Sequence, residues 1–219
     1  MTLFNENKYS KGFRFKESEL GVFSGNADNA IECLEKDFRL IGLTRGQFSL
    51  IDLIHSIIKK IGKSKIICCT WSAGIKDANQ IKWLINSNLI ESFTLVTDYS
   101  FALRQKKYAL AISDLFGDEN IRTSDVHAKF VLIRNDNWNI CIRTSMNLND
   151  NKTCETFEID ENKEIHDFYF NFVKETFKNT DKGFVEKMWV VNAALDKFFG
   201  EEKKIETKQS FGFFRMTNE

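Results

Sequence analysis

The chain has 219 residues, enough for one sizeable core and too few to predict two full domains. Its 31 basic and 31 acidic residues cancel, which excludes the strongly basic composition that would by itself predict a nucleic-acid partner. No apolar stretch approaches membrane-spanning length, and residues 1–7 lack a basic region followed by an apolar run. These features predict a cytoplasmic protein without a membrane segment.

In chain order, the patterns predict a helix over 26–38, a helix from a capped start at 44–47 to Ile61, a strand over 64–70, a helix over 76–86, a strand over 92–97, a helix over 101–116 and a short strand over 120–123. A hairpin over 127–143, a strand over 155–159 and helices over 165–178 and 184–199 follow. Strands that alternate with helices predict an α/β fold, a sheet flanked by crossover helices.

Three regions are expected. Residues 1–40 form an N-terminal extension, residues 41–200 the α/β domain, and residues 201–219 a C-terminal tail. The tail contains Phe211, Phe213 and Phe214, for which packing onto the body and docking of a partner both stay open.

Cysteine and histidine spacing predicts neither a metal nor a cofactor. The five cysteines show no C-x-x-C pattern, and the three histidines lie far apart. Buried, reduced thiols are expected instead. Cys68 and Cys69 are adjacent in an apolar stretch, so in a strand their side chains would face opposite sides of the sheet.

The stretch from His127 to Asn147 contains the residues with the clearest chemistry. On a strand, His127 and Lys129 would share one face, because side chains two residues apart point the same way. Residues 134–137 have turn composition, and the chain returns over 138–143. Ser145 and Asn147 share parity at the end of the returning strand. The hairpin therefore predicts an imidazole, an ammonium, a hydroxyl and an amide at one end of one sheet.

These residues resemble the signature of the phospholipase D superfamily, H-x-K-x4-D followed by G-S-x-N. The similarity rests on His127-Ala128-Lys129 and Thr144-Ser145-Met146-Asn147, with Glu155, or as the alternative Glu158, as the acidic residue that follows. The chain departs from the signature twice, since Arg134 stands where the aspartate is expected and Thr144 stands where the glycine is expected. The resemblance implies a phospholipase D-like mixed sheet flanked by helices.

The resemblance also implies a role for each residue. His127 is the nucleophile and forms a phosphohistidine, which divides a difficult hydrolysis into two displacements. Lys129 and Asn147 bind nonbridging phosphate oxygens, and Ser145 forms hydrogen bonds within the site. Glu155 accepts a hydrogen bond from an imidazole and orients it. Taken singly, each residue also has an ordinary structural role, as a strand histidine, a solvated lysine or a turn cap.

A second histidine is needed to protonate the leaving oxygen, and the sequence offers no good candidate within one chain. His55 is expected at the edge of a buried helical stripe, and His166 is expected to be solvated or lightly paired. A homodimer would supply a second copy of His127, as the resemblance to single-motif members of the superfamily implies.

The function predicted from these residues is a metal-independent phosphodiesterase, a nuclease acting on DNA. The alternative is a nucleic-acid-binding module that keeps the phosphate pocket without turnover. A lipid substrate has no support beyond the family name. Two groups of basic residues are candidates for a nucleic-acid patch: Lys59, Lys60, Lys63 and Lys65, and Arg104, Lys106 and Lys107. Trp71 and Trp138 lie close in sequence to predicted strand ends, where base stacking and core packing both stay open.

Overall fold

A computed structural model describes residues 17–22, 26–150 and 152–184 of the chain. The strands are β1 (Glu17–Val22), β2 (Phe38–Thr44), β3 (Ser64–Thr70), β4 (Ile90–Asp98), β5 (Ile121–Ser124), β6 (Phe130–Arg134), β7 (Asn139–Thr144) and β8 (Glu155–Glu161). The helices are α1 (Ala27–Ala30), α2 (Leu50–Ile61), α3 (Ile75–Asn86), α4 (Tyr99–Arg104), α5 (Lys106–Phe116) and α6 (Lys163–Asn179), with a 3-10 turn at Asp118–Asn120. The helix expected over 184–199 lies outside the described residues except for Phe184.

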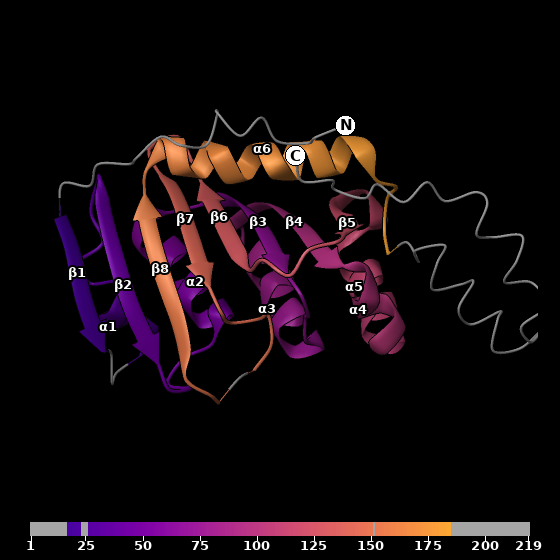
Figure 1. The fold of residues 1–219 in the computed structure, drawn as a ribbon, viewed down its shortest axis with the longest axis horizontal. Helices are drawn as coiled ribbons and strands as arrows, with labels where there is room; N and C mark the ends of the chain where they lie inside the picture. Colours follow the sequence, from indigo (N-terminus) through magenta and orange to yellow (C-terminus); the bar gives the residue numbers. More distant parts are fainter. Residues whose placement is uncertain (1–16, 23–25, 151, 185–219) are drawn as a thin grey trace, which may run out of the picture.

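The strands form one mixed sheet in the order β1-β2-β8-β7-β6-β3-β4-β5 (Figure 1). Strands β3, β4 and β5 run parallel, whereas β6, β7 and β8 follow as antiparallel neighbours. Helix α6 lies across one face, and α2, α3 and α5 lie on the other. This is the expected α/β class, a mixed sheet flanked by helices.

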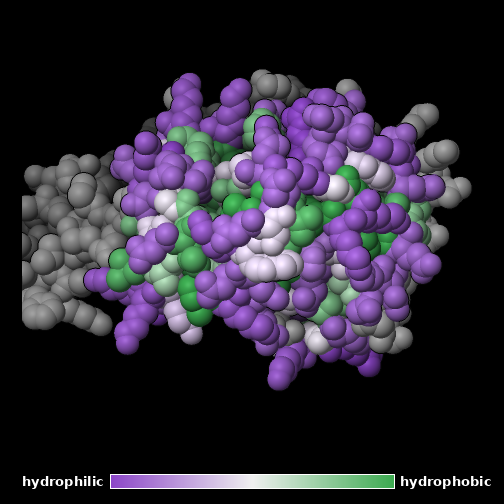
Figure 2. All heavy atoms as spheres, turned by 180° about the vertical axis from the view of Figure 1, so that it is seen from behind, coloured by the Kyte–Doolittle hydropathy of each residue, from purple (hydrophilic) through white to green (hydrophobic). Residues whose placement is uncertain are grey.

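Each face of the sheet has its own core. Cys68 belongs to the larger cluster under α2, α3 and α5, and Cys69 belongs to the smaller cluster under α6. The prediction that these neighbours face opposite sides of a strand is confirmed, because successive side chains of β3 alternate. Seen from behind, polar side chains cover most of the outer surface, with smaller hydrophobic areas between them (Figure 2).

Two expected helix boundaries are wrong. The helix expected over 26–38 is only α1, and Asp37 adopts a positive φ of 55° directly before the chain enters β2. The helix expected to start at 44–47 begins at Leu50, because Thr44 pairs with Glu155 in the sheet and Ser49 provides the cap. Sheet pairing, which is not visible in local periodicity, determines both boundaries.

Three further differences concern residues 1–40, 101–116 and Cys154. Strand β1 and the first residues of β2 lie in the expected N-terminal extension and belong to the sheet, so the boundary expected at residue 40 falls inside β2. The helix expected over 101–116 is divided at Gln105 into α4 and α5. Cys154 is exposed, whereas Cys68, Cys69 and Cys141 are buried as expected.

Candidate active site

Four strand ends meet at one end of the sheet, the lower end in Figure 1. Strands β3 and β7 finish there, and β6 and β8 begin there. The ladder continues past the strands, because Thr144 N donates to Lys129 O at 3.1 Å and Ser145 N donates to Thr156 O at 3.1 Å. The residues on either side of these ends are therefore neighbours in space.

His127 and Lys129 lie in the loop before β6, not in the strand itself as the hairpin pattern predicts. The ladder between β6 and β7 begins at Phe130, which pairs with Arg143. His127 is exposed, Lys129 is half-buried, and Lys129 Nζ donates to His127 O at 3.2 Å. The two residues lie together at the open end of the sheet, where solvent and a large substrate can reach them.

Ser145 and Glu155 form a hydrogen-bonded unit. The hydroxyl of Ser145 donates to Glu155 Oε2 and accepts from Thr156 N at 2.9 Å. The hydroxyl of Thr153 donates to Glu155 Oε1 at 3.1 Å. Because Glu155 is only 9% exposed, these donors replace much of the water that its carboxylate would otherwise bind.

Asn147 is tied to the end of β3 through Thr70, a residue that the sequence patterns did not single out. The hydroxyl of Thr70 donates to Ser72 O at 2.9 Å, lies 3.3 Å from Asn147 Oδ1 and accepts from Leu148 N at 3.2 Å. Gly74 N donates to Leu148 O at 2.7 Å, which ties the same loop to the start of α3. The contact with Thr70 is made by the oxygen of the Asn147 amide, so it leaves the amide N–H groups unused.

The other two histidines lie away from this end. His55 is exposed on α2, where its ring meets Trp83 at a centroid distance of 6.1 Å. His166 is 2% exposed near the start of α6 and lies 3.4 Å from Asp167, so of the two expectations solvation is wrong and light pairing is confirmed. Burial lowers the pKa of His166, against the opposing effect of Asp167, which lies 3.4 Å away. Of the three histidines, His127 alone belongs to the candidate site.

Structure explains both departures from the superfamily signature. Arg134 ends β6 at the far end of the strand, about 16 Å along the chain from Lys129, so it takes no part in this site. The hydroxyl of Thr144 donates to Thr156 O at 2.7 Å and accepts from Met146 N at 3.0 Å. Thr144 is absent from the described non-glycine residues with positive φ, so its backbone conformation does not require glycine.

Only one of the two basic groups is near the site. The first group belongs to the opposite end of β3, where Lys59 pairs with Asp28 at 2.9 Å and Lys65 with Glu91 at 3.2 Å. In the second group, the guanidinium of Arg104 lies 3.7 Å from the ring centroid of Trp71, directly after β3. Trp71 in turn contacts the ring of His127 at a centroid distance of 5.6 Å. Lys106 and Lys107 are exposed at the start of α5.

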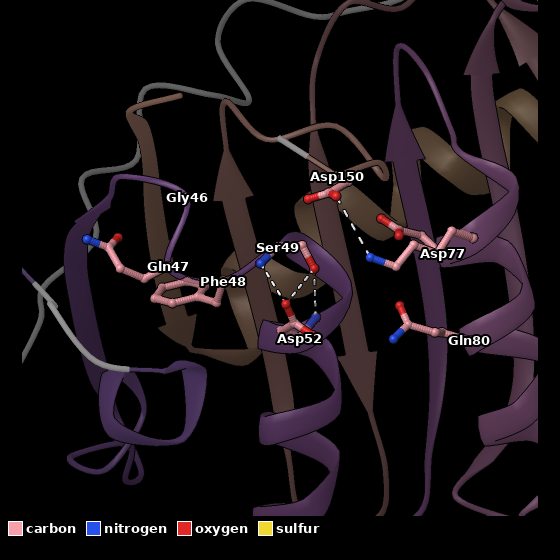
Figure 3. A pocket seen from close by; sticks show the side chains of 9 residues that line it. Gly46, Gln47, Phe48, Ser49, Asp52, Asp77, Gln80 and Asp150 are labelled. Carbon is pink, nitrogen blue, oxygen red and sulfur yellow. Dashed lines mark hydrogen bonds and ion pairs between the residues drawn. The ribbon is translucent and has the colours of Figure 1, made fainter. Parts of the chain in front are cut away.

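A small polar pocket of about 100 Å³ lies between the starts of α2 and α3 (Figure 3). Asp52, Asp77 and Asp150 line it, together with Ser49 and neutral amides. Asp77 is 1% exposed, and no described residue donates to its Oδ2. Burial raises the pKa of Asp77 to about 6, with Lys76 opposing and Asp150 and Asp52 adding to the shift.

No protein-family model and no curated protein matches this chain. It is similar to the solved structure of NucT from Helicobacter pylori, with 14% sequence identity and a TM-score of 0.49 over 66% of this chain and 99% of that one. It is also similar to Nuc from Salmonella typhimurium, a phospholipase D family member, with 10% identity and a TM-score of 0.46 over 68% and 98% of the two chains.

A third similar structure is the phosphatidylserine synthase of Haemophilus influenzae, with 13% identity and a TM-score of 0.46 over 78% of this chain and 46% of that one. Within the described residues, no helix is long and apolar enough to cross a bilayer.

Proposed function

We propose that the protein is a phosphodiesterase that cleaves DNA without a metal ion, through a covalent phosphohistidine on His127. The observation that supports this most directly is the meeting of His127, Lys129, Ser145, Asn147 and Glu155 at one end of the sheet. A nucleophile, cationic and neutral hydrogen-bond donors and a buried carboxylate are the groups that such a mechanism needs.

The proposed reaction has two displacements. In the first, one ring nitrogen of His127 attacks phosphorus, the P–N bond forms, and the P–O bond to the leaving alcohol breaks. A second imidazole gives its proton to that leaving oxygen. In the second displacement, the same imidazole takes a proton from water, which attacks phosphorus while the P–N bond breaks. The electron pair of that bond returns to His127, and the phosphate monoester leaves.

The remaining residues stabilise the phosphoryl group as negative charge gathers on its oxygens. Lys129 supplies a full positive charge, and the N–H groups of Asn147, whose amide oxygen lies 3.3 Å from Thr70 Oγ1, supply dipoles. Glu155 is proposed to orient the second imidazole through its carboxylate, which Ser145 and Thr153 hold in place.

A second copy of the chain is proposed to supply the second imidazole. His55 and His166 belong to other parts of the fold, so a single chain offers only one histidine at the site. Two copies related by a twofold axis would place one His127 against the other, giving one composite site per homodimer.

A nucleic-acid substrate is favoured by the surroundings of His127. Trp71 contacts the His127 ring and also the guanidinium of Arg104, so a cation lies one side chain away from the proposed nucleophile and can attract a polyanion. Lys106 and Lys107 extend the positive charge onto α5. This rim of positive charge is local, since the chain as a whole carries no net formal charge.

The test is cleavage of single- and double-stranded DNA in excess EDTA. Wild type is expected to cleave, and His127→Ala is expected to lose at least about 1,000-fold in rate because the covalent route is gone. His55→Ala, which changes a histidine away from the site, should keep the wild-type rate. Trapping with acid should recover a phosphorylated or nucleotide-linked protein from wild type alone.

Other results would point elsewhere. Cleavage that EDTA abolishes would overturn the metal-free mechanism. Salt-sensitive DNA binding by wild type and His127→Ala alike, without cleavage by either, would identify a binding module instead.

A further inference from the structure

Three side chains from different elements form a stack beside the proposed nucleophile. Trp71 follows β3, Arg104 lies in the last turn of α4, and His127 lies in the loop before β6. The guanidinium of Arg104 lies 3.7 Å from the centroid of the Trp71 ring. The His127 ring lies 5.6 Å from Trp71, centroid to centroid, with the planes tilted by 55°.

Arg104 is held in this position by two further contacts. Its Nε donates to Ser100 Oγ at 3.3 Å, and its Nη2 donates to Trp71 O at 3.5 Å. Ser100 is held in turn by Asp98, which caps α4. The arginine therefore braces the indole from α4, although Arg104 itself is exposed.

The imidazole of His127 needs such support. It sits exposed in a loop, and its backbone carbonyl is the atom that Lys129 contacts, not its ring. An exposed side chain in a loop visits several rotamers, yet attack in line with the leaving oxygen requires one orientation. Trp71 is the large, rigid surface against which the ring lies.

We propose that Trp71, braced by Arg104, is a positioning residue that holds the His127 imidazole in the orientation for attack on phosphorus. The catalytic part of this inference rests on the proposed phosphodiesterase function, whereas the stack itself does not. In this role Trp71 contacts the nucleophile, so its effect is expected on the chemical step. A base-stacking role would instead place the effect on DNA binding.

Core packing alone does not account for Trp71. Trp71 is partly exposed, and the two ring neighbours described above, Arg104 and His127, are both polar and both exposed. An indole that served only the core would be expected to pack among the buried aliphatic side chains of one of the two clusters, and Trp71 belongs to neither.

The stack is tested first by tryptophan fluorescence, which needs no activity. An imidazole in contact with an indole quenches its emission, so His127→Ala should raise the emission at constant pH. Trp83 also has a histidine neighbour, His55, and is therefore replaced by Phe in every protein compared. In that background the rise caused by His127→Ala should be absent when Trp71→Phe is also present, and should persist when Trp138→Phe is also present.

The positioning role is tested by single-turnover cleavage at saturating DNA. Trp71→Leu should slow the chemical step about 10- to 100-fold with the Kd for DNA changed less than about 3-fold, because a misplaced nucleophile costs rate. Trp71→Phe, which keeps a flat ring, should recover most of the rate. Arg104→Gln should give a smaller loss than Trp71→Leu, since it removes the brace and keeps the indole.

The outcomes separate the two proposals. A higher Kd for Trp71→Leu with an unchanged rate would overturn positioning in favour of base stacking. Emission that His127→Ala leaves unchanged would overturn the stack itself. If wild type cleaves nothing while the fluorescence changes as expected, the proposed function fails and the stack stands.

Discussion

Glu155 is a buried carboxylate whose stability depends on neighbouring hydroxyls. Ser145 donates to one oxygen and Thr153 to the other, and Ser145 also accepts from Thr156 N. Hydrogen bonds to a charged, buried group are worth more than those between neutral groups. Ser145 therefore supports the fold of this end of the sheet in addition to its proposed place in catalysis.

Ser145→Ala is expected to lower the free energy of unfolding by about 1–3 kcal/mol, because Glu155 loses a donor and Thr156 N loses its acceptor. Urea unfolding measures the change. Ser145→Thr keeps the hydroxyl and should lie closer to wild type. A Ser145→Ala protein as stable as wild type would mean that water replaces the hydroxyl at no cost.

Helices α2 and α3 both have an aspartate as their third residue, but only the aspartate of α2 forms a capping box. In α2, Asp52 completes a capping box by accepting from Ser49 N at 2.8 Å. In α3, Asp77 occupies the matching position, but the N-cap donor, Gly74 N, is already bound to Leu148 O. Leu148, in the loop that follows Asn147, thus occupies the backbone N–H that Asp77 would bind in a capping box. The Asp77 carboxylate faces the pocket of Figure 3 instead, and its Oδ2 has no hydrogen-bond donor among the described residues.

This difference predicts a pH dependence of stability. Burial raises the pKa of Asp77 from 3.8 to about 6, so between these pH values the folded chain holds a proton that the unfolded chain has released. The contribution of Asp77 to the free energy of unfolding therefore falls as pH rises from about 4 to about 6, by about 2–3 kcal/mol, and stays low above that range. Chemical unfolding at each pH measures it.

Asp77→Asn should remove this slope and be more stable than wild type above pH about 6, because an uncharged amide replaces a buried charge. Asp114→Asn, which changes an exposed carboxylate on α5, should keep the slope. Equal slopes in wild type and Asp77→Asn would show that the pocket gives Asp77 a donor after all.

Sequence patterns predicted those elements whose limits depend on local chemistry. Strand β3 was expected over its full length, and α3 within one residue, since an apolar run and a helical period define them. The patterns failed where pairing with strands distant in the sequence sets the limit of an element. Phe38, for example, was expected at the end of a helix but begins β2, which pairs with β1 and β8. At the site, the motif names His127 and the residues proposed to act with it. Thr70 belongs to no motif, and Arg104 was expected only as part of a basic group, so their contacts with Asn147 and Trp71 are visible only in the structure.

At the scale of the whole molecule, the number of histidines at the site is the main argument for a homodimer. Each chain brings one histidine to the site, and the proposed reaction uses two. A composite site predicts that a dimer of one wild-type and one His127→Ala chain is inactive, although half of its histidines at the site are intact. Independent sites in each chain predict half of the wild-type activity for the same dimer.

Co-expression of differently tagged wild-type and His127→Ala chains, followed by purification on both tags in sequence, isolates that mixed dimer. Its cleavage of DNA in EDTA is expected to fall to the level of the His127→Ala homodimer, because the leaving oxygen lacks a proton donor or the phosphorus lacks a nucleophile. The matched control is a mixed dimer of wild type and His55→Ala, in which a histidine away from the site is removed and full activity is expected. Half activity in the His127→Ala mixed dimer would contradict the composite site, since it would mean that each chain completes the reaction with a single histidine.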